Sequence, residues 1–293
     1  CAPGEWVEVR VGPRAHRGGV LGDGAGDHPP GKLRPIRRVV PLPPMPPETR
    51  TFLDRMADYT LTERGMTLRL ATRAPELAEP PGTRTVLARG PVTPERLTPA
   101  RARVLDALGE ADAPPTPAEL ARAAGVSAGV VKGLLESGAL AAREAPRDPP
   151  YPRLDPDAAP RALSPAQEDA AAALREAVAA RTYATILLRG VTGSGKTEVY
   201  LEAVAECLRQ GRQALILLPE IALTDAFLDR FAARFGALPA EWHSAVTPRD
   251  RRRCWRAVAA GEARVVAGAR SALFLPFENL GLVIVDEEHD TAY

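Results

Sequence analysis

The second half of the chain alternates short apolar runs with amphipathic stretches. Runs of strand length occur at 184–188, 213–218, 263–268 and 282–285, and the last of them predicts a fully buried strand. The stretches between them place apolar residues three and four positions apart, which is the helical period. Strands that alternate with helices predict a parallel sheet, so we expect an α/β unit over 163–293. Its main helices are expected at 198–209, 227–235 and 248–260.

The region 1–75 has the pattern of a small β-rich domain closed by a helix. Residues 5–11 alternate apolar and polar positions, as a strand does, and a glycine-rich turn region follows at 18–26. The segment 48–60 carries an apolar stripe at helical spacing, formed by Phe52, Leu53, Met56 and Tyr59. Such positions are more typical of a core than of a ligand site. The segment 76–96 contains proline, glycine and threonine and is expected to be a linker.

Residues 97–145 contain three short helical patterns. The second begins with a capping box formed by Thr116 and Glu119. Two helices, a tight turn and a third helix are typical of a helix-turn-helix, and 139–145 could form the wing of a winged helix. The third helix directs only Lys132 outward, whereas helices that read the major groove usually carry more basic or amide side chains. Contact with DNA and a packing role therefore both stay open.

The α/β region and its approach contain features with more than one interpretation. Residues 146–162 are rich in proline and aspartate and are expected to be a linker. The helix at 248–260 is very basic, which would suit DNA, but its arginines spread over more than one face, which favours a solvated surface. His243 is more typical of a local hydrogen bond than of a metal ligand, because no other metal-binding residue types lie near it in the sequence.

Composition places few constraints on the partners. The 293 residues include 38 basic and 37 acidic side chains, for a net charge of +1, so any DNA-binding surface must be local. Cys1, Cys207 and Cys254 are isolated, so neither a disulfide framework nor a zinc site is expected here. No apolar run reaches about 18 residues, so we expect no membrane contact and a reducing, cytoplasmic setting. The chain starts with Cys and stops soon after 282–285, so we expect it to be a fragment.

The run 190–197 fits the phosphate-binding pattern G-x-x-x-x-G-K-[ST]. It follows the apolar run 184–188 and opens the helix at 198–209, which is the strand–loop–helix context that the motif needs. The backbone amides of such a loop and the N-terminus of its helix attract phosphate oxygens. Lys196 would reach the β- and γ-phosphates, and the Thr197 hydroxyl would ligate Mg²⁺. The candidate nucleotide-binding residues are Gly190, Val191, Thr192, Gly193, Ser194, Gly195, Lys196 and Thr197.

Two carboxylates follow the apolar run 282–285. They lie at the carboxyl end of a parallel strand, where open α/β sheets bind ligands. Asp286 is placed to hold Mg²⁺, and Glu287 is the candidate that orients and activates the attacking water. A strand that ends in acidic residues can also be an ordinary transition into a loop. With the loop at 190–197, however, a shared Mg·ATP site is the better interpretation, and Lys196, Asp286 and Glu287 are its candidate catalytic residues.

Five motifs in order resemble the PriA family of bacterial primosomal replication-restart helicases. They are GVTGSGKTEVY at 190–200, LLPEIALT at 217–224, WHS at 242–244, GARSALF at 268–274 and VDEEH at 285–289. The opening PGEWVEV resembles the entry to the family's 3′-end DNA-binding domain, and the region 97–145 is similar to its winged helix. The resemblance implies that 163–293 is a RecA-like first helicase lobe of a superfamily 2 DExH ATPase.

The resemblance also implies roles for single residues. Gln167 matches the position that reads the adenine edge, although it can equally be an ordinary exposed glutamine near a helix start. His289 would link hydrolysis to DNA, with further DNA contacts at Thr224, Arg270 and Ser271. Ala269 replaces the threonine of the family's usual G-T-R-S run, so the resemblance leaves one hydroxyl contact in doubt.

The resemblance further implies an activity and partners. The family recognises stalled or abandoned forks, unwinds DNA 3′→5′ with ATP and Mg²⁺, and reloads the replicative helicase. Its implied partners are forked and single-stranded DNA, primosome proteins and single-stranded DNA-binding protein. A cysteine-rich module that binds Zn²⁺ and a second lobe are expected only in a part that follows residue 293. Because that lobe supplies a catalytic arginine, we expect residues 1–293 alone to hydrolyse ATP poorly.

Two other functions stay open at this point. One is a non-catalytic primosome scaffold that binds DNA junctions and keeps a vestigial ATP site. The complete set Lys196, Thr197, Asp286 and Glu287 argues against lost chemistry. The other is a different superfamily 2 DNA translocase, which a winged helix placed before the phosphate-binding loop disfavours.

Overall fold

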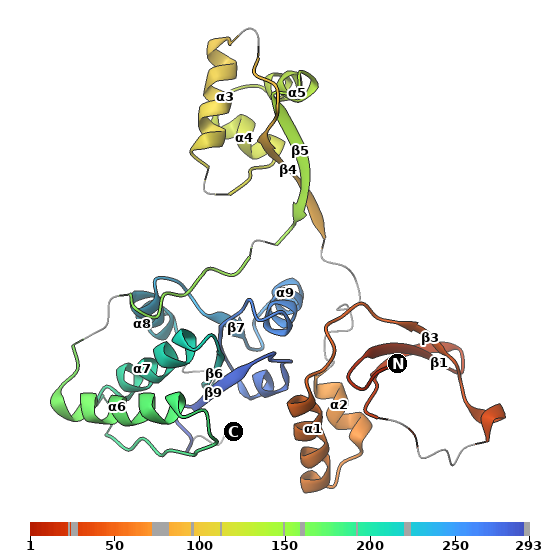
Figure 1. Cartoon of the computed structure of the whole chain (residues 1–293), viewed down its shortest axis with the longest axis vertical. Coiled ribbons are helices and arrows are strands. Elements are labelled where there is room, and N and C mark those ends of the chain that lie inside the picture. Colours follow the sequence, from red (N-terminus) through yellow and green to blue (C-terminus); the bar gives the residue numbers. More distant parts are fainter. Residues whose placement is uncertain are drawn as a thin grey trace. The chain divides into compact units, whose positions relative to one another are not determined.

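The computed structural model divides the chain into two compact units (Figure 1). The first joins Cys1–Glu79 to Pro150–Tyr293, and the second is Pro80–Pro149. The structure describes all residues except 23, 25–28, 72–81, 95–96, 112, 149, 159–161, 192, 220–223 and 290–293. Among the helices in the described ranges, none is both long enough and apolar enough to cross a membrane.

The first unit begins with a three-stranded antiparallel sheet in the order β2-β1-β3. Its strands are β1 (Trp6–Val11), β2 (Arg14–Gly19) and β3 (Ile36–Val39), with the short helix η1 (Pro30–Lys32) before β3. Two helices follow, α1 (Pro47–Thr60) and α2 (Arg64–Ala71). The strand expected at 5–11 and the helix expected at 48–60 are confirmed, whereas β2 enters the region that was expected to be a turn.

The second unit packs three helices against a two-stranded sheet. The helices are α3 (Pro99–Gly109), α4 (Pro117–Ala123) and α5 (Ala128–Glu136), and the strands are β4 (Thr83–Arg89) and β5 (Leu140–Pro146). Leu87, Leu120 and Leu134 are fully buried in their common core. The helical patterns predicted here and the capping box of Thr116 and Glu119 are confirmed.

The prediction of a linker over 76–96 is wrong where β4 lies. β4 pairs with β5 along its whole length, from Thr83 opposite Pro146 to Arg89 opposite Leu140, and its Leu87 is fully buried. β-Branched residues favour such a pairing. The partner strand lies beyond all three helices, so the local sequence alone carries little sign of the pairing.

The second part of the first unit contains a four-stranded parallel sheet in the order β7-β8-β6-β9. Its strands are β6 (Gln213–Leu217), β7 (Ala240–Trp242), β8 (Val265–Gly268) and β9 (Leu280–Val285). The helices are α6 (Pro165–Ala179), α7 (Lys196–Arg209), α8 (Asp225–Phe235) and α9 (Pro248–Ala259), and the short η3 (Arg270–Phe274) follows β8. The predicted parallel α/β arrangement is confirmed for these elements.

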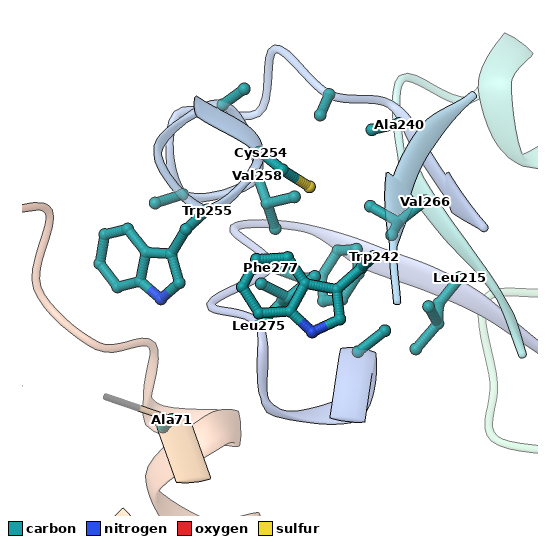
Figure 2. Close-up of a cluster of buried hydrophobic side chains, with 14 of the residues drawn as sticks. Ala71, Leu215, Ala240, Trp242, Cys254, Trp255, Val258, Val266, Leu275 and Phe277 are labelled. Atoms are coloured by element: carbon teal, nitrogen blue, oxygen red, sulfur yellow. The ribbon is translucent and has the colours of Figure 1, made fainter. Parts of the chain in front are cut away.

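Successive residues of β6 point to opposite faces of the sheet and enter different cores. Ile216 belongs to the core formed with α7 and α8, where Phe231 and Phe235 are fully buried. Leu215 belongs to the core formed with α9 (Figure 2). All five residues of β6 are buried, as expected for a parallel strand covered on both faces.

The strand predicted at 184–188 is not present in the structure. This segment is irregular, and Ile186 and Leu187 are 50% and 68% exposed. The prediction that 282–285 is fully buried is also wrong, because Val283 and Val285 of β9 are 43% and 46% exposed. β9 is the edge strand of the described sheet and has a neighbour, β6, on one side only, and the structure pairs the described run 184–188 with no strand.

The N-terminal sheet and the parallel sheet share one core. The indole rings of Trp6 in β1 and Trp255 in α9 meet edge to face, with centroids 6.0 Å apart. Phe52 of α1 packs against Phe274 of η3 at 5.8 Å. Figure 2 shows part of this core, with Trp255 and Cys254 of α9, Trp242 of β7 and Ala71 of α2. The sequence motifs do not predict this shared core.

Candidate nucleotide-binding site

The loop before α7 has the backbone geometry of a phosphate cradle. Gly193 and Gly195 have φ values of +79° and +80°, a left-handed conformation that glycine adopts without strain. Gly195 is also the N-cap of α7, so the unpaired amides of the first helical turn face the end of the loop. A Cβ atom at Gly195 would collide with Nε2 of Gln167. The predicted residue Thr192 lies outside the described residues.

Lys196 is folded back over this loop. Its Nζ donates to the carbonyl oxygens of Gly190 at 2.9 Å and Val191 at 3.4 Å. These contacts hold the ammonium group at the mouth of the loop. A phosphate oxygen could replace either carbonyl as the acceptor.

The carboxylate of Asp286 is oriented by hydrogen bonds to both of its oxygens. Its Oδ2 accepts a hydrogen bond from the Tyr200 hydroxyl at 2.9 Å, and its Oδ1 accepts one from the Glu287 amide at 3.0 Å. The amide of Asp286 donates to Leu217 at 3.0 Å, which extends the β6–β9 ladder by one bond. Glu287 has a φ of +52°, and a non-glycine residue in this conformation stores about 1–3 kcal/mol of strain.

The loop and the carboxylates line one cavity of about 210 Å³. The structure therefore brings together Lys196, Thr197, Asp286 and Glu287, as the sequence predicts, although α7 and β9 are far apart in the chain. Among the described residues, the lining consists of Gly193, Ser194, Gly195, Lys196, Thr197, Glu198, Arg230, Asp286 and Glu287. A mixed set of cations, carboxylates and loop amides suits a polyphosphate with its metal ion.

The donor set fits Mg²⁺. Thr197 offers a hydroxyl and Asp286 a carboxylate, and both line the cavity. Mg²⁺ prefers oxygen ligands and is usually held by one or two carboxylates together with substrate phosphates and water. In the described ranges no three His, Cys, Asp or Glu side chains cluster as a metal site.

Sequence reasoning missed three residues at this site. Arg230 of α8 lines the cavity, and its Nε lies 3.5 Å from Oε1 of Glu198, which also lines it. Tyr200 lies four residues after Lys196, on the same side of α7. Its burial, with the adjacent Asp286 carboxylate, raises the pKa of its phenol far above the usual range. The spacing from Lys196 could have pointed to Tyr200, but no local signal marks Arg230.

Gln167 connects the loop to α6. Its Oε1 accepts from the Ser164 amide at 2.8 Å, which completes a capping box, and its Nε2 donates to the Ser194 carbonyl at 2.9 Å. Gln167 is not among the residues that line the cavity. Its side chain therefore braces the loop, and the predicted contact with adenine stays a prediction.

The predicted DNA-coupling residues lie outside the cavity lining. Arg270 and Ser271 begin η3, where Arg270 is exposed and Ser271 is half-buried. Thr224 is exposed at the N-cap of α8. His289 is 75% exposed, and its Nε2 lies 3.4 Å from Glu287 Oε2. His289 is thus the one that touches a cavity residue.

Two other sequence interpretations can be compared with the structure. The basic helix α9 is not simply a solvated surface, because Arg251 donates to the His243 carbonyl at 2.8 Å and its guanidinium lies over the Trp242 ring. Arg253 lies over the Tyr151 ring at 4.2 Å. The local hydrogen bond predicted for His243 is confirmed, since its Nε2 is 3.2 Å from Glu241 Oε2.

Known protein families match both parts of the first unit. Residues 164–293 match the DEAD/DEAH box helicase family, and residues 1–73 match the 3′DNA-binding domain (3′BD) family. The replication restart protein PriA of Bacillus subtilis is 40% identical over 178 residues, which is 60% of this chain and 22% of that protein. PriA of Synechocystis is 40% identical over 200 residues, or 68% and 24%.

A third relative, PriA of Rickettsia felis, is 52% identical over 107 residues, which is 36% of this chain and 16% of that protein. The chain thus matches about a quarter or less of the length of these relatives. A 3′DNA-binding domain and a helicase domain in one chain, together with these relatives, show that the chain belongs to the PriA family of replication restart proteins.

Proposed function

We propose that this chain supplies the ATP-binding lobe and a DNA-binding part of a 3′→5′ DNA helicase that restarts replication. The observation that carries the proposal is the cavity in which Lys196 and Thr197 meet Asp286 and Glu287. A phosphate-binding loop and an acidic pair on one cavity are what a nucleotide-driven motor requires. The family membership supports DNA unwinding at forks as the work that ATP drives.

Within the cavity each group has a distinct task. The loop amides and Lys196 bind the phosphates, while the Thr197 hydroxyl and the Asp286 carboxylate hold Mg²⁺. When bound, Mg²⁺ neutralises the phosphate charge. Glu287 accepts a hydrogen bond from the attacking water and orients it toward the γ-phosphate. Its strained backbone supports this role, because such strain is concentrated at functional positions.

DNA would be coupled to the cavity through the loops at the carboxyl ends of the strands. His289 lies beside Glu287, so a movement of the DNA that displaces His289 would reach the water-orienting carboxylate. A backbone phosphate of DNA is readily bound where strands and helices end. Arg270 and Ser271 follow the end of β8, and Thr224 precedes α8. Ala269 has no hydroxyl to add to them.

The rest of the proposal concerns the whole protein. The three-helix unit is proposed to be a winged helix, whose contact with DNA stays open. Forked and single-stranded DNA are the proposed substrates, and primosome proteins and single-stranded DNA-binding protein the proposed partners, in a cytoplasmic setting. A Zn²⁺-binding module is proposed for the remainder of the protein.

The test is a Lys196→Ala substitution in the whole protein. We expect it to abolish ATP hydrolysis and fork unwinding, because the loop loses its phosphate-binding cation, while fork binding is largely kept. Unwinding is measured on a forked substrate, and fork binding by anisotropy. Lys132→Ala is the control for ATP hydrolysis measured without DNA, because Lys132 is 77% exposed in α5, and it should hydrolyse ATP normally.

Two outcomes would contradict the proposal. Unwinding by the Lys196→Ala protein would remove Lys196 from its role. Fork binding by the unsubstituted whole protein without any ATP hydrolysis would instead favour a non-catalytic scaffold.

A further inference from the structure

Tyr200 of α7 contacts Asp286, one of the two predicted metal-binding residues. It is 5% exposed, and its ring belongs to the core between α7, α8 and the parallel sheet. Its hydroxyl donates to Asp286 Oδ2 at 2.9 Å. One buried hydroxyl thus links the start of α7 to the end of β9.

Two contacts fix the orientation of the Asp286 carboxylate. Tyr200 donates to Oδ2, and the Glu287 amide donates to Oδ1. Because Tyr200 is held by the core, the carboxylate plane is held with it. A ligand that is already oriented loses less freedom when a metal binds.

We propose that Tyr200 is a positioning residue that orients the Asp286 carboxylate toward the divalent cation of a bound nucleotide. This inference rests on the proposed nucleotide site, and it adds a residue to that site. It differs from a purely structural hydrogen bond in one respect. A structural role would affect folding, whereas a positioning role affects the part of nucleotide affinity that depends on the metal.

The test is Tyr200→Phe in this chain, which removes the hydroxyl and keeps the ring in the core. Binding of a fluorescent ATP analogue is titrated in EDTA and at increasing Mg²⁺. In EDTA, we expect Tyr200→Phe to bind the analogue with the same affinity as the unsubstituted chain. Mg²⁺ raises this affinity, and the variant should need about a tenfold higher Mg²⁺ concentration to reach half of that rise. A change of this size is typical when a residue that orients a metal ligand is lost. Tyr59→Phe is the matched control, because Tyr59 is 91% exposed on α1.

A double substitution shows whether Tyr200 acts through Asp286. Asp286→Asn should remove most of the Mg²⁺ response, and adding Tyr200→Phe to it should then change nothing further, since the two positions form one interaction. An additional loss in the double variant would overturn the proposed route. Thermal unfolding without ligand checks that each variant is folded.

The outcomes separate this inference from the proposed function. If the unsubstituted chain binds the analogue but shows no response to Mg²⁺, the proposed metal-nucleotide site is wrong. If the unsubstituted chain responds to Mg²⁺ and Tyr200→Phe responds at the same concentration, only the role of Tyr200 is wrong. A Tyr200→Phe protein that loses affinity equally with EDTA and with Mg²⁺ would show a structural role instead.

Discussion

At the scale of single residues, the three cysteines occupy opposite environments. Cys1 is exposed, whereas Cys207 and Cys254 are fully buried. Burial raises the pKa of the Cys207 thiol from 9.0 to about 11 and that of Cys254 from 9.0 to about 12, because the thiolate would lose its hydration. The buried thiols are therefore neutral core side chains, and Cys1 is the reactive one.

These pKa values predict how stability depends on pH. In the folded state both buried thiols keep their protons to a higher pH than in the unfolded state. Below about pH 9 the contribution of the buried thiols to the free energy of unfolding is complete. This contribution is lost as the pH rises toward 11 and 12, by up to about 1.4 kcal/mol per pH unit for each thiol. Urea unfolding between pH 8 and 10.5 measures how the free energy of unfolding changes with pH. Cys1→Ser is the control, and it should leave this pH dependence unchanged. Equal labelling of all three cysteines by iodoacetamide in the folded chain at pH 8 would contradict the assignment.

One buried ion pair explains why a proline-rich segment is ordered. Arg234 is 6% exposed, and its Nε lies 2.8 Å from Glu202 Oε1. The same guanidinium donates to the carbonyls of Pro156 and Ala158 at 3.0 and 2.8 Å. Arg209 adds a contact with Asp157 at 2.9 Å. The segment expected to be a linker at 146–162 is thus attached, in its described residues 154–158, to the helices of the parallel sheet.

Local sequence motifs identify some of the residues at the candidate site and miss others. Lys196 and Asp286 are recognisable because each motif is local, with its residues next to one another in the chain. Arg230 is not recognisable in this way, and the position of Tyr200 four residues after Lys196 does not reveal the partner of its hydroxyl. The importance of both residues comes from partners on β9 and α7 that only the fold brings near.

At the scale of elements, the loop before α7 depends on α6. Gln167 belongs to the capping box of α6 through its Oε1 and holds the Ser194 carbonyl through its Nε2. The two ends of one amide therefore join a helix start to the phosphate-binding loop. This contact explains the position of Gln167 without a nucleotide base.

This arrangement predicts the effect of Gln167→Glu. The carboxylate still accepts from the Ser164 amide but cannot donate to Ser194, so α6 is kept and the loop loses its brace. We expect the affinities for ATP and GTP to fall together, by about fivefold, as for the loss of a hydrogen bond worth about 1 kcal/mol. Binding of fluorescent analogues of both nucleotides measures this. A loss confined to ATP would instead support the adenine contact.

The elements also show why some strands could be predicted and others not. β6 and β8 are apolar runs that form the two central strands of the sheet, each with a neighbouring strand on both sides. Their sequences alone identify them as strands. The run 184–188 is equally apolar but does not form a strand. β4 is less apolar, with threonine at two of its first three positions, and it is a strand because β5 pairs with it. Pairing, which is non-local, decides each case.

At the scale of the molecule, the N-terminal sheet and the parallel sheet are joined by one core. Trp6 is 5% exposed, its Nε1 donates to the Pro43 carbonyl at 2.9 Å, and its ring meets Trp255. A DNA-binding domain and a nucleotide-binding lobe that share a core can be expected to lose stability together.

Trp6→Ala tests this coupling. Removing a buried tryptophan should cost about 3–5 kcal/mol, because it leaves a cavity, and the loss should reach both sheets. Hydrogen exchange measured by mass spectrometry should show faster exchange in β1 and in β6. Val11→Ala in the same strand is the control, since Val11 is 60% exposed. Faster exchange limited to β1–β3 would mean that the two sheets unfold separately.

The sequence by itself determined the α/β pattern of the second half, the phosphate-binding loop at 190–197 and the acidic pair after 282–285. Each of these depends on residues close together in the chain, whose periodicity or spacing carries the information. The tertiary structure alone decided that β4 pairs with β5, that the run 184–188 is not a strand, that Trp6 meets Trp255, and that Tyr200 reaches Asp286. These depend on which distant segments meet, because burial and pairing are properties of neighbours in space.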